Sequence, residues 1–427
     1  MKKTERDFII RLIKREVVPA IGCTEPIAVA LCVSKAARLL GKEPEKIKVL
    51  LSANILKNAM GVGIPGTGMI GLPIAVALGA LAGNPDYQLE VLKDITDDVE
   101  RGKQVIAENR IDIQLKENIA EKLYIEVIMS AGPDETTAII SGGHTCFVYE
   151  ARNGNVLLDE RISAVAEESE EDGSLSLRKV YDFALTAPLE EIDFILDSAR
   201  LNKAAAEASF KGDYGHSLGK SLRNDNERRV MGDSVFTRIL SYTSGACDAR
   251  MAGAMIPVMS NSGSGNQGIA ATLPVVVYAE ENQKSREEMI RALVLSHLTV
   301  IYIKQSLGRL SALCGCVVAA TGSSCGITYL MGGGYEEMTY AVKNMVANLT
   351  GMICDGAKPS CAMKLTSGVS TAVFSAMLAM EHKCVTAVEG IIENDVDRTI
   401  HNLTRIGAQG MNETDRLVLD IMTHKCP

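Results

Sequence analysis

Apolar residues recur at helical spacing through most of the chain. Two such segments span residues 5–19 and 26–41, and the same period dominates again beyond residue 177. The second segment begins with Thr24, Glu25 and Pro26, which is a good helix start because proline is tolerated in the first turn. This pattern predicts a mainly helical protein.

The stretch from residue 121 to residue 158 follows a different pattern. Apolar and polar residues alternate there with period two, and an Asn-Gly turn lies at Asn153. This alternation favours at least three strands. A further short strand is expected at 47–53, just after the second helix.

These elements predict the fold class α+β, mainly helical. We expect an all-helical domain formed by residues 1–85 and 178–427, which holds the chemistry, and a small α/β domain inserted over residues 86–177. The acidic stretch 163–176 would be the exit from the insertion. One small mixed sheet is expected, confined to roughly residues 86–160.

Composition and charge argue against several classes of protein. The chain has 427 residues, 47% of them hydrophobic and 23% charged, which is ordinary for a globular protein. The net charge of −9, without a basic stripe, argues against nucleic acid as a partner. The first residues lack the continuous apolar segment of a signal peptide, and the longest apolar run, 69–83, is too short to span a membrane. We therefore expect a cytoplasmic protein with no membrane partner.

Cysteine positions are informative in such a protein, because a reducing compartment argues against structural disulfides. Cys314-Gly-Cys316 and the pair Cys354 and Cys361 lie in glycine-rich breaks of the helical pattern. The seven-residue spacing of the second pair does not match the usual zinc motifs, whereas iron–sulfur clusters accept irregular spacing and require thiolates. Packing cysteines are the alternative interpretation. Five others are scattered and are interpreted as small buried residues: Cys32, Cys146, Cys247, Cys384 and Cys426.

Cys23 is expected at or just before a helix N-terminus. The free N–H groups and the helix dipole would stabilise its thiolate and lower its pKa, making it a candidate base or nucleophile. A buried thiol without a function fits the sequence equally well.

The loop SNSGSGNQG, residues 260–268, precedes a helix expected from about Ile269. It lacks the lysine of a phosphate-binding loop and the context of a dinucleotide fingerprint. Its backbone N–H groups and its Ser and Asn side chains suit a small anion such as a carboxylate. A tight glycine-rich turn is the alternative.

Four segments together carry a family resemblance: Cys-Thr-Glu-Pro at 23–26, Ser-Gly-Ser-Gly-Asn-Gln-Gly at 262–268, Leu-Cys-Gly-Cys at 313–316 and Ile-Cys-Asp-Gly-Ala-Lys-Pro-Ser-Cys at 353–361. With them the chain resembles, from about residue 20 to 420, the L-cysteine desulfidases. These proteins are single-chain relatives of the iron–sulfur L-serine dehydratase alpha chain.

The resemblance implies a [4Fe–4S] cluster held by three cysteines, with one iron open to substrate. Cys354 and Cys361 match two ligand positions, and the third is Cys316 or Cys314, of which Cys316 is the better match. Cys23 matches the catalytic proton acceptor. The expected substrate-binding residues are Thr24, Glu25, Ser262, Ser264, Gly265 and Asn266. No Schiff-base motif is evident, so pyridoxal phosphate is not expected.

The expected activity is conversion of L-cysteine to pyruvate, sulfide and ammonia, with a small amino acid as the partner. An L-serine dehydratase is the alternative, because the two substrates differ by one atom. A non-catalytic iron–sulfur or metal-binding sensor or scaffold is the alternative of another class. The inserted domain is interpreted as regulatory or as the surface of a homodimer.

Overall fold

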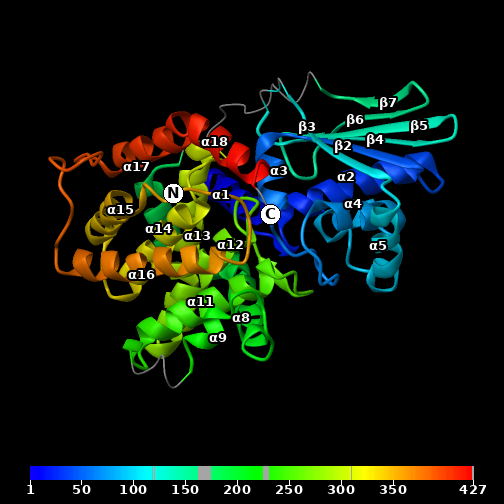
Figure 1. Ribbon diagram of the computed structural model, residues 1–427. Coiled ribbons are helices and arrows are strands. Elements are labelled where there is room, and N and C mark those ends of the chain that lie inside the picture. Colours follow the sequence, from blue (N-terminus) through cyan, green and yellow to red (C-terminus); the bar gives the residue numbers. More distant parts are fainter. Residues whose placement is uncertain (118, 120, 162–174, 225–229, 309, 426–427) are drawn as a thin grey trace.

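The computed structural model describes residues 1–117, 119, 121–161, 175–224, 230–308 and 310–425. In this part of the chain helices dominate and a small mixed sheet accompanies them, so the predicted fold class is confirmed. Figure 1 shows two units side by side, a large group of helices and a sheet with helices on one of its faces.

The sheet has six strands in the order β3-β2-β4-β5-β6-β7. Their bounds are β2 (Lys46–Leu51), β3 (Ile111–Leu115), β4 (Tyr124–Ala131), β5 (Asp134–Ser141), β6 (Phe147–Arg152) and β7 (Asn155–Asp159). β2 and β3 run parallel, and every other neighbouring pair is antiparallel. Alternate residues of β4 are buried, from Ile125 to Ala131, because one face of the sheet packs on a helix.

That face is covered by α2 (Thr24–Leu40), with α4 (Leu72–Leu81) behind it (Figure 1). The unit also contains α3 (Ala53–Ala59), α5 (Val99–Ala107) and two short 3₁₀ turns, Pro85–Glu90 and Thr96–Asp98.

The prediction that the sheet is confined to residues 86–160 is wrong. β2 lies inside the sheet, between β3 and β4, and buries Ile47, Val49 and Leu51. One hydrophobic core joins residues of α2, α3 and α4 to those of the sheet, from Ile27 to Ile140, together with Leu310. Its predicted exit at 163–176 lies almost wholly outside the described residues.

The helical unit contains the remaining helices. Their bounds are α1 (Lys3–Glu16), α6 (Leu177–Thr186), α7 (Leu189–Ile192), α8 (Leu196–Ser209), α9 (Leu218–Ser221), α11 (Val235–Met251), α12 (Gly265–Glu281), α13 (Arg286–Leu307), α14 (Gly315–Leu330), α15 (Tyr335–Leu349), α16 (Cys361–Met380), α17 (Val396–Arg405) and α18 (Asn412–Thr423). A 3₁₀ turn, Asp193–Ile195, lies between α7 and α8, and a π turn, Ile406–Gly410, lies between α17 and α18.

Close helix contacts in this unit depend on small residues. A Cβ at Gly322 of α14 would come within 2.4 Å of the carbonyl oxygen of Ser296 on α13, so only glycine lets the two backbones approach this far. Of the described helices, α16 alone is long and apolar enough to span a membrane. Half of its apolar window is buried inside the protein, and core helices pass the same test, so the length of α16 is weak evidence for a span.

Two short strands join the N-terminal segment to the helical unit. β1 (Pro19–Ile21) pairs antiparallel with β8 (Pro257–Met259), with Pro19 opposite Met259. The segment that follows β1 leads to Cys23, and the segment that follows β8 is the glycine-rich loop. The pairing therefore brings together two segments that lie more than 200 residues apart in the sequence.

Candidate active site

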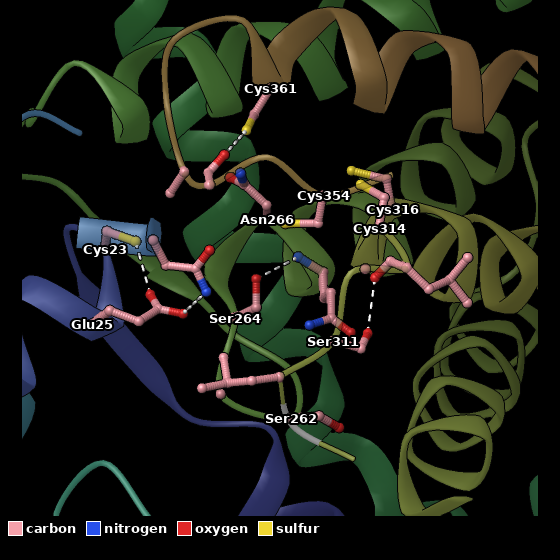
Figure 2. A pocket seen from close by; sticks show the side chains of 18 of the residues that line it. Cys23, Glu25, Ser262, Ser264, Asn266, Ser311, Cys314, Cys316, Cys354 and Cys361 are labelled. Atoms are coloured by element: carbon pink, nitrogen blue, oxygen red, sulfur yellow. Dashed lines mark hydrogen bonds between the residues drawn. The ribbon is translucent and has the colours of Figure 1, made fainter. Parts of the chain in front are cut away.

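One pocket collects most of the residues singled out from the sequence. It encloses about 720 Å³ of empty space, part of it open to solvent. Figure 2 shows Cys23 and Glu25 on one side, Cys314, Cys316 and Cys354 on the other, and Asn266 between them. Of the predicted site residues, nine line the pocket: Cys23, Glu25, Ser262, Ser264, Asn266, Cys314, Cys316, Cys354 and Cys361.

Cys23 caps the N-terminus of α2, as expected, and its side chain is only 2% exposed. Its Sγ donates a hydrogen bond to Oε2 of Glu25 at 3.0 Å, and Nδ2 of Asn58 donates to the other carboxylate oxygen at 3.2 Å. Glu25 is itself buried. The thiol is therefore held by a carboxylate that a neighbouring amide fixes in place (Figure 2).

The predicted lowering of the Cys23 pKa is wrong for this arrangement. Burial, and then the negative charge of Glu25, raise the pKa of the thiol well above its ordinary value, and the nearby Arg250 offsets only part of this rise. Loss of solvation and a like charge outweigh the helix N-terminus, because both disfavour the thiolate. The side chain is therefore a protonated thiol that donates to Glu25.

Part of the glycine-rich loop is a tight turn, the alternative interpretation of that sequence. Asn261 and Ser264 exchange backbone hydrogen bonds at 3.1 and 3.0 Å, and Ser262 and Gly263 between them have φ values of 49° and 79°. Two consecutive residues with positive φ are typical of a type I′ turn. Thr24 donates to the carbonyl oxygen of Gly263 at 2.6 Å, which ties the segment after Cys23 to this turn.

The side chains of this loop serve structure as well as the pocket. Ser262 donates to Oδ1 of Asn261 at 2.8 Å, and Oγ of Ser264 caps α12 by accepting from the N–H of Gln267. Thr24 and Gly265 do not line the pocket, although they hold neighbours that do. Substrate binding by these residues stays a prediction.

A buried arginine in the pocket was not predicted from the sequence. Arg250, near the end of α11, is 3% exposed, and its Nη1 donates to Oδ1 of Asn266 at 3.0 Å. A sequence signal existed, because Arg250 is a charged residue within ARMAGAM, the otherwise small and apolar run of residues 249–255. Charged residues are rarely buried without a reason.

Cys314 and Cys354 lie beside each other on paired segments. Leu313 and Ile353 form a β-bridge, the N–H of Cys314 donates to Met352 at 3.0 Å, and that of Cys354 donates to Ala312 at 2.6 Å. This pairing brings two cysteines 40 residues apart in the sequence to one wall of the pocket. The two predicted cysteine-containing breaks are thus parts of one local structure.

The thiols in this wall interact with one another. A hydrogen bond from Cys316 lowers the pKa of Cys314 to about 7, whereas the same interaction raises that of Cys316. Burial raises the pKa of Cys354 to about 11. Cys361 begins α16, and burial also raises its pKa. A neutral thiol packs as a small apolar side chain, so these positions fit both packing residues and the ligands of a metal site.

Cys247 also belongs to this neighbourhood, although its sequence position had suggested a scattered packing residue. It is fully buried on α11, and its Sγ lies 3.5 Å from Oδ1 of Asn266. Burial, and then the charge of Cys361, raise the pKa of this thiol. One helical turn separates it from Arg250, so α11 presents both side chains near Asn266.

The residues fit an iron–sulfur cluster in donor type, and they line one pocket. In the described part of the chain, no three His, Cys, Asp or Glu side chains converge where one metal ion would bind. A four-iron cluster takes each thiolate on a different iron, so convergence on one point is not its requirement. Two segments, residues 313–316 and 353–361, supply four thiols to one pocket, which is the donor type that such a cluster needs.

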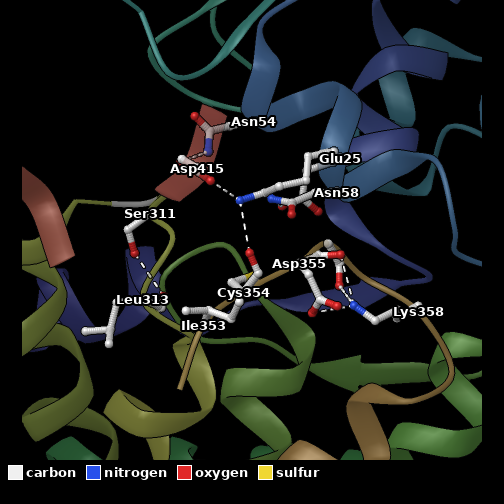
Figure 3. A network of polar contacts seen from close by, with 12 residues as sticks. Glu25, Asn54, Asn58, Ser311, Leu313, Ile353, Cys354, Asp355, Lys358 and Asp415 are labelled. Carbon is white, nitrogen blue, oxygen red and sulfur yellow. Dashed lines mark hydrogen bonds and ion pairs between the residues drawn. The ribbon is translucent and has the colours of Figure 1, made fainter. Parts of the chain in front are cut away.

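A buried ion pair supports the segment that carries Cys354. Lys57 of α3 is 1% exposed, donates to the carbonyl oxygen of Cys354 at 3.3 Å and pairs with Asp415 of α18. Asn54 donates to the second oxygen of Asp415 at 2.6 Å (Figure 3). The α/β unit and the last described helix therefore meet at the cysteine segment.

Gly356 completes this contact. Its φ of 89° lies in the left-handed region, and a Cβ there would come within 2.3 Å of the carbonyl oxygen of Lys57. Only glycine satisfies both conditions. Lys358 pairs with Asp355 (Figure 3), and Lys364 pairs with the same carboxylate.

Comparison with known proteins agrees with this reading of the thiol segments. A model of the serine dehydratase alpha chain matches residues 86–420, which include the glycine-rich loop and the four pocket cysteines of residues 314–361, but not Cys23. The UPF0597 proteins of Bacteroides fragilis and Bacteroides thetaiotaomicron are 75% and 74% identical over 426 residues, with 99% or more of each chain covered. The UPF0597 protein of Oleidesulfovibrio alaskensis is 47% identical over 429 residues, with both chains fully covered. The chain belongs to the serine dehydratase alpha chain family.

Proposed function

We propose that the protein is an iron–sulfur-dependent lyase that converts L-cysteine to pyruvate, sulfide and ammonia. The observation that carries the proposal is the shared pocket, which is lined by the Cys23 thiol and by the thiols of two other segments, 313–316 and 353–361. Membership of an iron–sulfur family of lyases supports the same chemistry.

In this proposal Cys354, Cys361 and one cysteine of the Cys314-Gly-Cys316 element would hold a [4Fe–4S] cluster. When bound, the cluster would supply a Lewis-acidic iron with an open position for the substrate. At the ligand segment the three lysines Lys57, Lys358 and Lys364 outnumber the two aspartates with which they pair, and this excess of positive charge would favour the thiolates.

Cys23 would accept the α-proton of the substrate. The thiol first gives its own proton to Glu25, which already accepts its hydrogen bond. The thiolate then takes the α-proton, the Cα electron pair forms the Cα–Cβ double bond, and the Cβ–S bond breaks with release of sulfide. The aminoacrylate product becomes an imine and hydrolyses to pyruvate and ammonia. A base with a raised pKa suits this step, because the α-proton is only weakly acidic.

Cysteine is preferred over serine in the proposal because a soft thiolate binds an iron–sulfur centre more readily than a hard hydroxyl. L-Serine dehydration is the second candidate, favoured by the family that matches the chain. The same pocket could also hold a cluster in a sensor without turnover.

Anaerobic kinetics with the reconstituted protein distinguish these functions. We expect kcat/KM for L-cysteine to exceed that for L-serine, with pyruvate and sulfide formed in equal amounts. A preference for serine would overturn the substrate assignment and leave the lyase chemistry standing. An intact cluster without pyruvate from either amino acid would favour the sensor.

The third ligand can be assigned by replacing Cys314 and Cys316 separately with serine. We expect only one replacement to remove most of the bound iron, because the cluster needs three protein thiolates and two come from Cys354 and Cys361. Iron content and visible absorbance after anaerobic reconstitution are the measurements. If both variants bind as much iron as the unchanged protein, this element supplies no ligand.

A further inference from the structure

We propose that Arg250 binds the α-carboxylate of the substrate, and that the buried amide oxygens of Asn58 and Gln267 receive its ammonium group. The proposal rests on the proposed function for the identity of the ligand as an amino acid. Its evidence is separate from the thiols, because it comes from polar groups in the same pocket that lack a partner.

Arg250 is a buried cation without an anion. No carboxylate among the described residues forms an ion pair with it, its Nε has no hydrogen-bond partner, and Nη1 contacts only Asn266 and, at 4.0 Å, the sulfur of Met251. Burying a charge is costly unless the charge is paired, and a guanidinium offers five donors in a planar fork that matches a carboxylate. A ligand carboxylate would supply the missing partner.

The start of α12 is shaped to admit this guanidinium. A Cβ at Gly265 would come within 2.2 Å of Nε and 2.8 Å of Cζ of Arg250, so any other residue there would displace the side chain. α12 is 17 residues long, and its N-terminal residues Asn266 and Gln267 line the pocket. The positive end of its dipole therefore adds to the attraction for an anion.

Two amide oxygens of the pocket have the opposite character. Oδ1 of Asn58 and Oε1 of Gln267 are buried acceptors without a donor, and both residues line the pocket. The orientation of the Asn58 amide is fixed, because its Nδ2 donates to Glu25. The pocket thus holds a cation with free donors, which suits the carboxylate of an α-amino acid. It also holds acceptors without donors, which suit the ammonium group.

The position of Arg250 also suits the proposed proton transfer. Its charge reaches Cys23, since it lowers the pKa of that thiol against the larger effects of burial and Glu25. The carboxylate carbon of an amino acid is bonded directly to Cα. Holding the carboxylate at Arg250 would therefore keep the α-proton in the same pocket as the Cys23 sulfur.

The test compares a ligand that has a carboxylate with one that lacks it. L-Alanine keeps both charged groups but has no leaving group, and cysteamine keeps the ammonium and thiol but not the carboxylate. With the anaerobically reconstituted protein, Arg250→Gln should weaken L-alanine binding about 10- to 100-fold, the range for hydrogen bonds to charged groups, and leave cysteamine binding unchanged. The KM for L-cysteine should rise by a similar factor.

Two further variants keep the test informative if Arg250→Gln does not fold. Arg250→Lys should restore part of the L-alanine affinity, because the charge is kept and the fork is lost. Gly265→Ala should reproduce the loss while the arginine is still present. Arg200→Gln, which changes an exposed arginine of α8, is the matched control and should alter neither ligand.

The outcomes separate this proposal from the proposed function. Equal loss of L-alanine and cysteamine binding, no loss of either, or no binding of L-alanine by the unchanged protein would overturn the role of Arg250. Release of pyruvate from cysteine with an unaltered KM in Arg250→Gln would overturn it too, and leave the lyase standing. Arg250-dependent binding of L-alanine without turnover of any amino acid would support the anchor and refute the lyase.

Discussion

Cys23→Ala is expected to lose nearly all turnover of L-cysteine while it keeps its iron and its fold. The thiol is the proposed acceptor of the α-proton, and a positioned general base contributes about 10²- to 10⁴-fold to a rate. The side chain supplies no ligand to the proposed cluster, so the iron content should not fall. Anaerobic kcat, iron content and thermal unfolding, measured on the same preparation, check the three parts of this expectation.

Cys146→Ala is the control for this experiment. It makes the same chemical change at an exposed thiol of the α/β unit that does not line the pocket, and should leave all three measurements unchanged. Full activity in Cys23→Ala would remove the proposed base, and loss of iron would instead make Cys23 part of the cluster site.

Glu25→Gln adds a test of the same group through its pH dependence. Glu25 raises the pKa of Cys23 by its charge and by the hydrogen bond that it accepts, so removing the charge should lower that pKa. In the proposed transfer, however, Glu25 takes up the proton of the thiol. Without this acceptor the thiol must lose its proton to solvent, so the rising limb of kcat/KM, which reports groups of the free enzyme, should move to higher pH. A limb that stays in place, or that moves to lower pH, would contradict Glu25 as the acceptor of the Cys23 proton.

The second large effect is expected in Cys354→Ser and Cys361→Ser. Each removes one of the three thiolates proposed to hold the cluster, which would leave one iron without a protein ligand. Loss of a residue that merely orients a metal ligand costs about 10- to 100-fold in affinity, so the loss of a ligand itself should exceed this range. Iron content and visible absorbance after reconstitution are the measurements.

Cys384→Ser is a matched control, because Cys384 is partly exposed like Cys354 and Cys361 but lies outside the pocket. It should bind as much iron as the unchanged protein. If both pocket variants also keep their iron, these thiols are packing residues, the alternative that the sequence left open.

Local patterns predicted the fold class, because helical spacing and period-two alternation are properties of neighbouring residues. They did not predict the extent of the sheet. β2 pairs with β4, more than 70 residues later, and with β3, so its place depends on contacts that no local pattern records. The strand itself was expected near residue 47, and only its partners were missed.

The candidate site was likewise predicted only in part. The resemblance selected residues that the structure brings into one pocket, but it could not select Arg250 or Cys247, whose positions depend on how α11 packs against Asn266. The direction of the Cys23 pKa was wrong because the helix N-terminus is visible in the sequence, whereas the burial of the thiol and the approach of Glu25 are not. The helix N-terminus does favour the thiolate, but burial and the charge of Glu25 have the larger effect on the pKa.

Asp415 is translated after both Cys354 and Cys361, yet it is the counter-ion of the lysine that holds the Cys354 segment. A chain still on the ribosome that has not reached α18 therefore carries every proposed ligand but leaves Lys57 without this partner. Domains tend to fold during synthesis, N-terminal parts first, so the α/β unit can form while the ligand segment still lacks its support. Stable loading with iron and sulfur would then follow completion of the chain, which protects a half-made protein from holding a reactive cofactor.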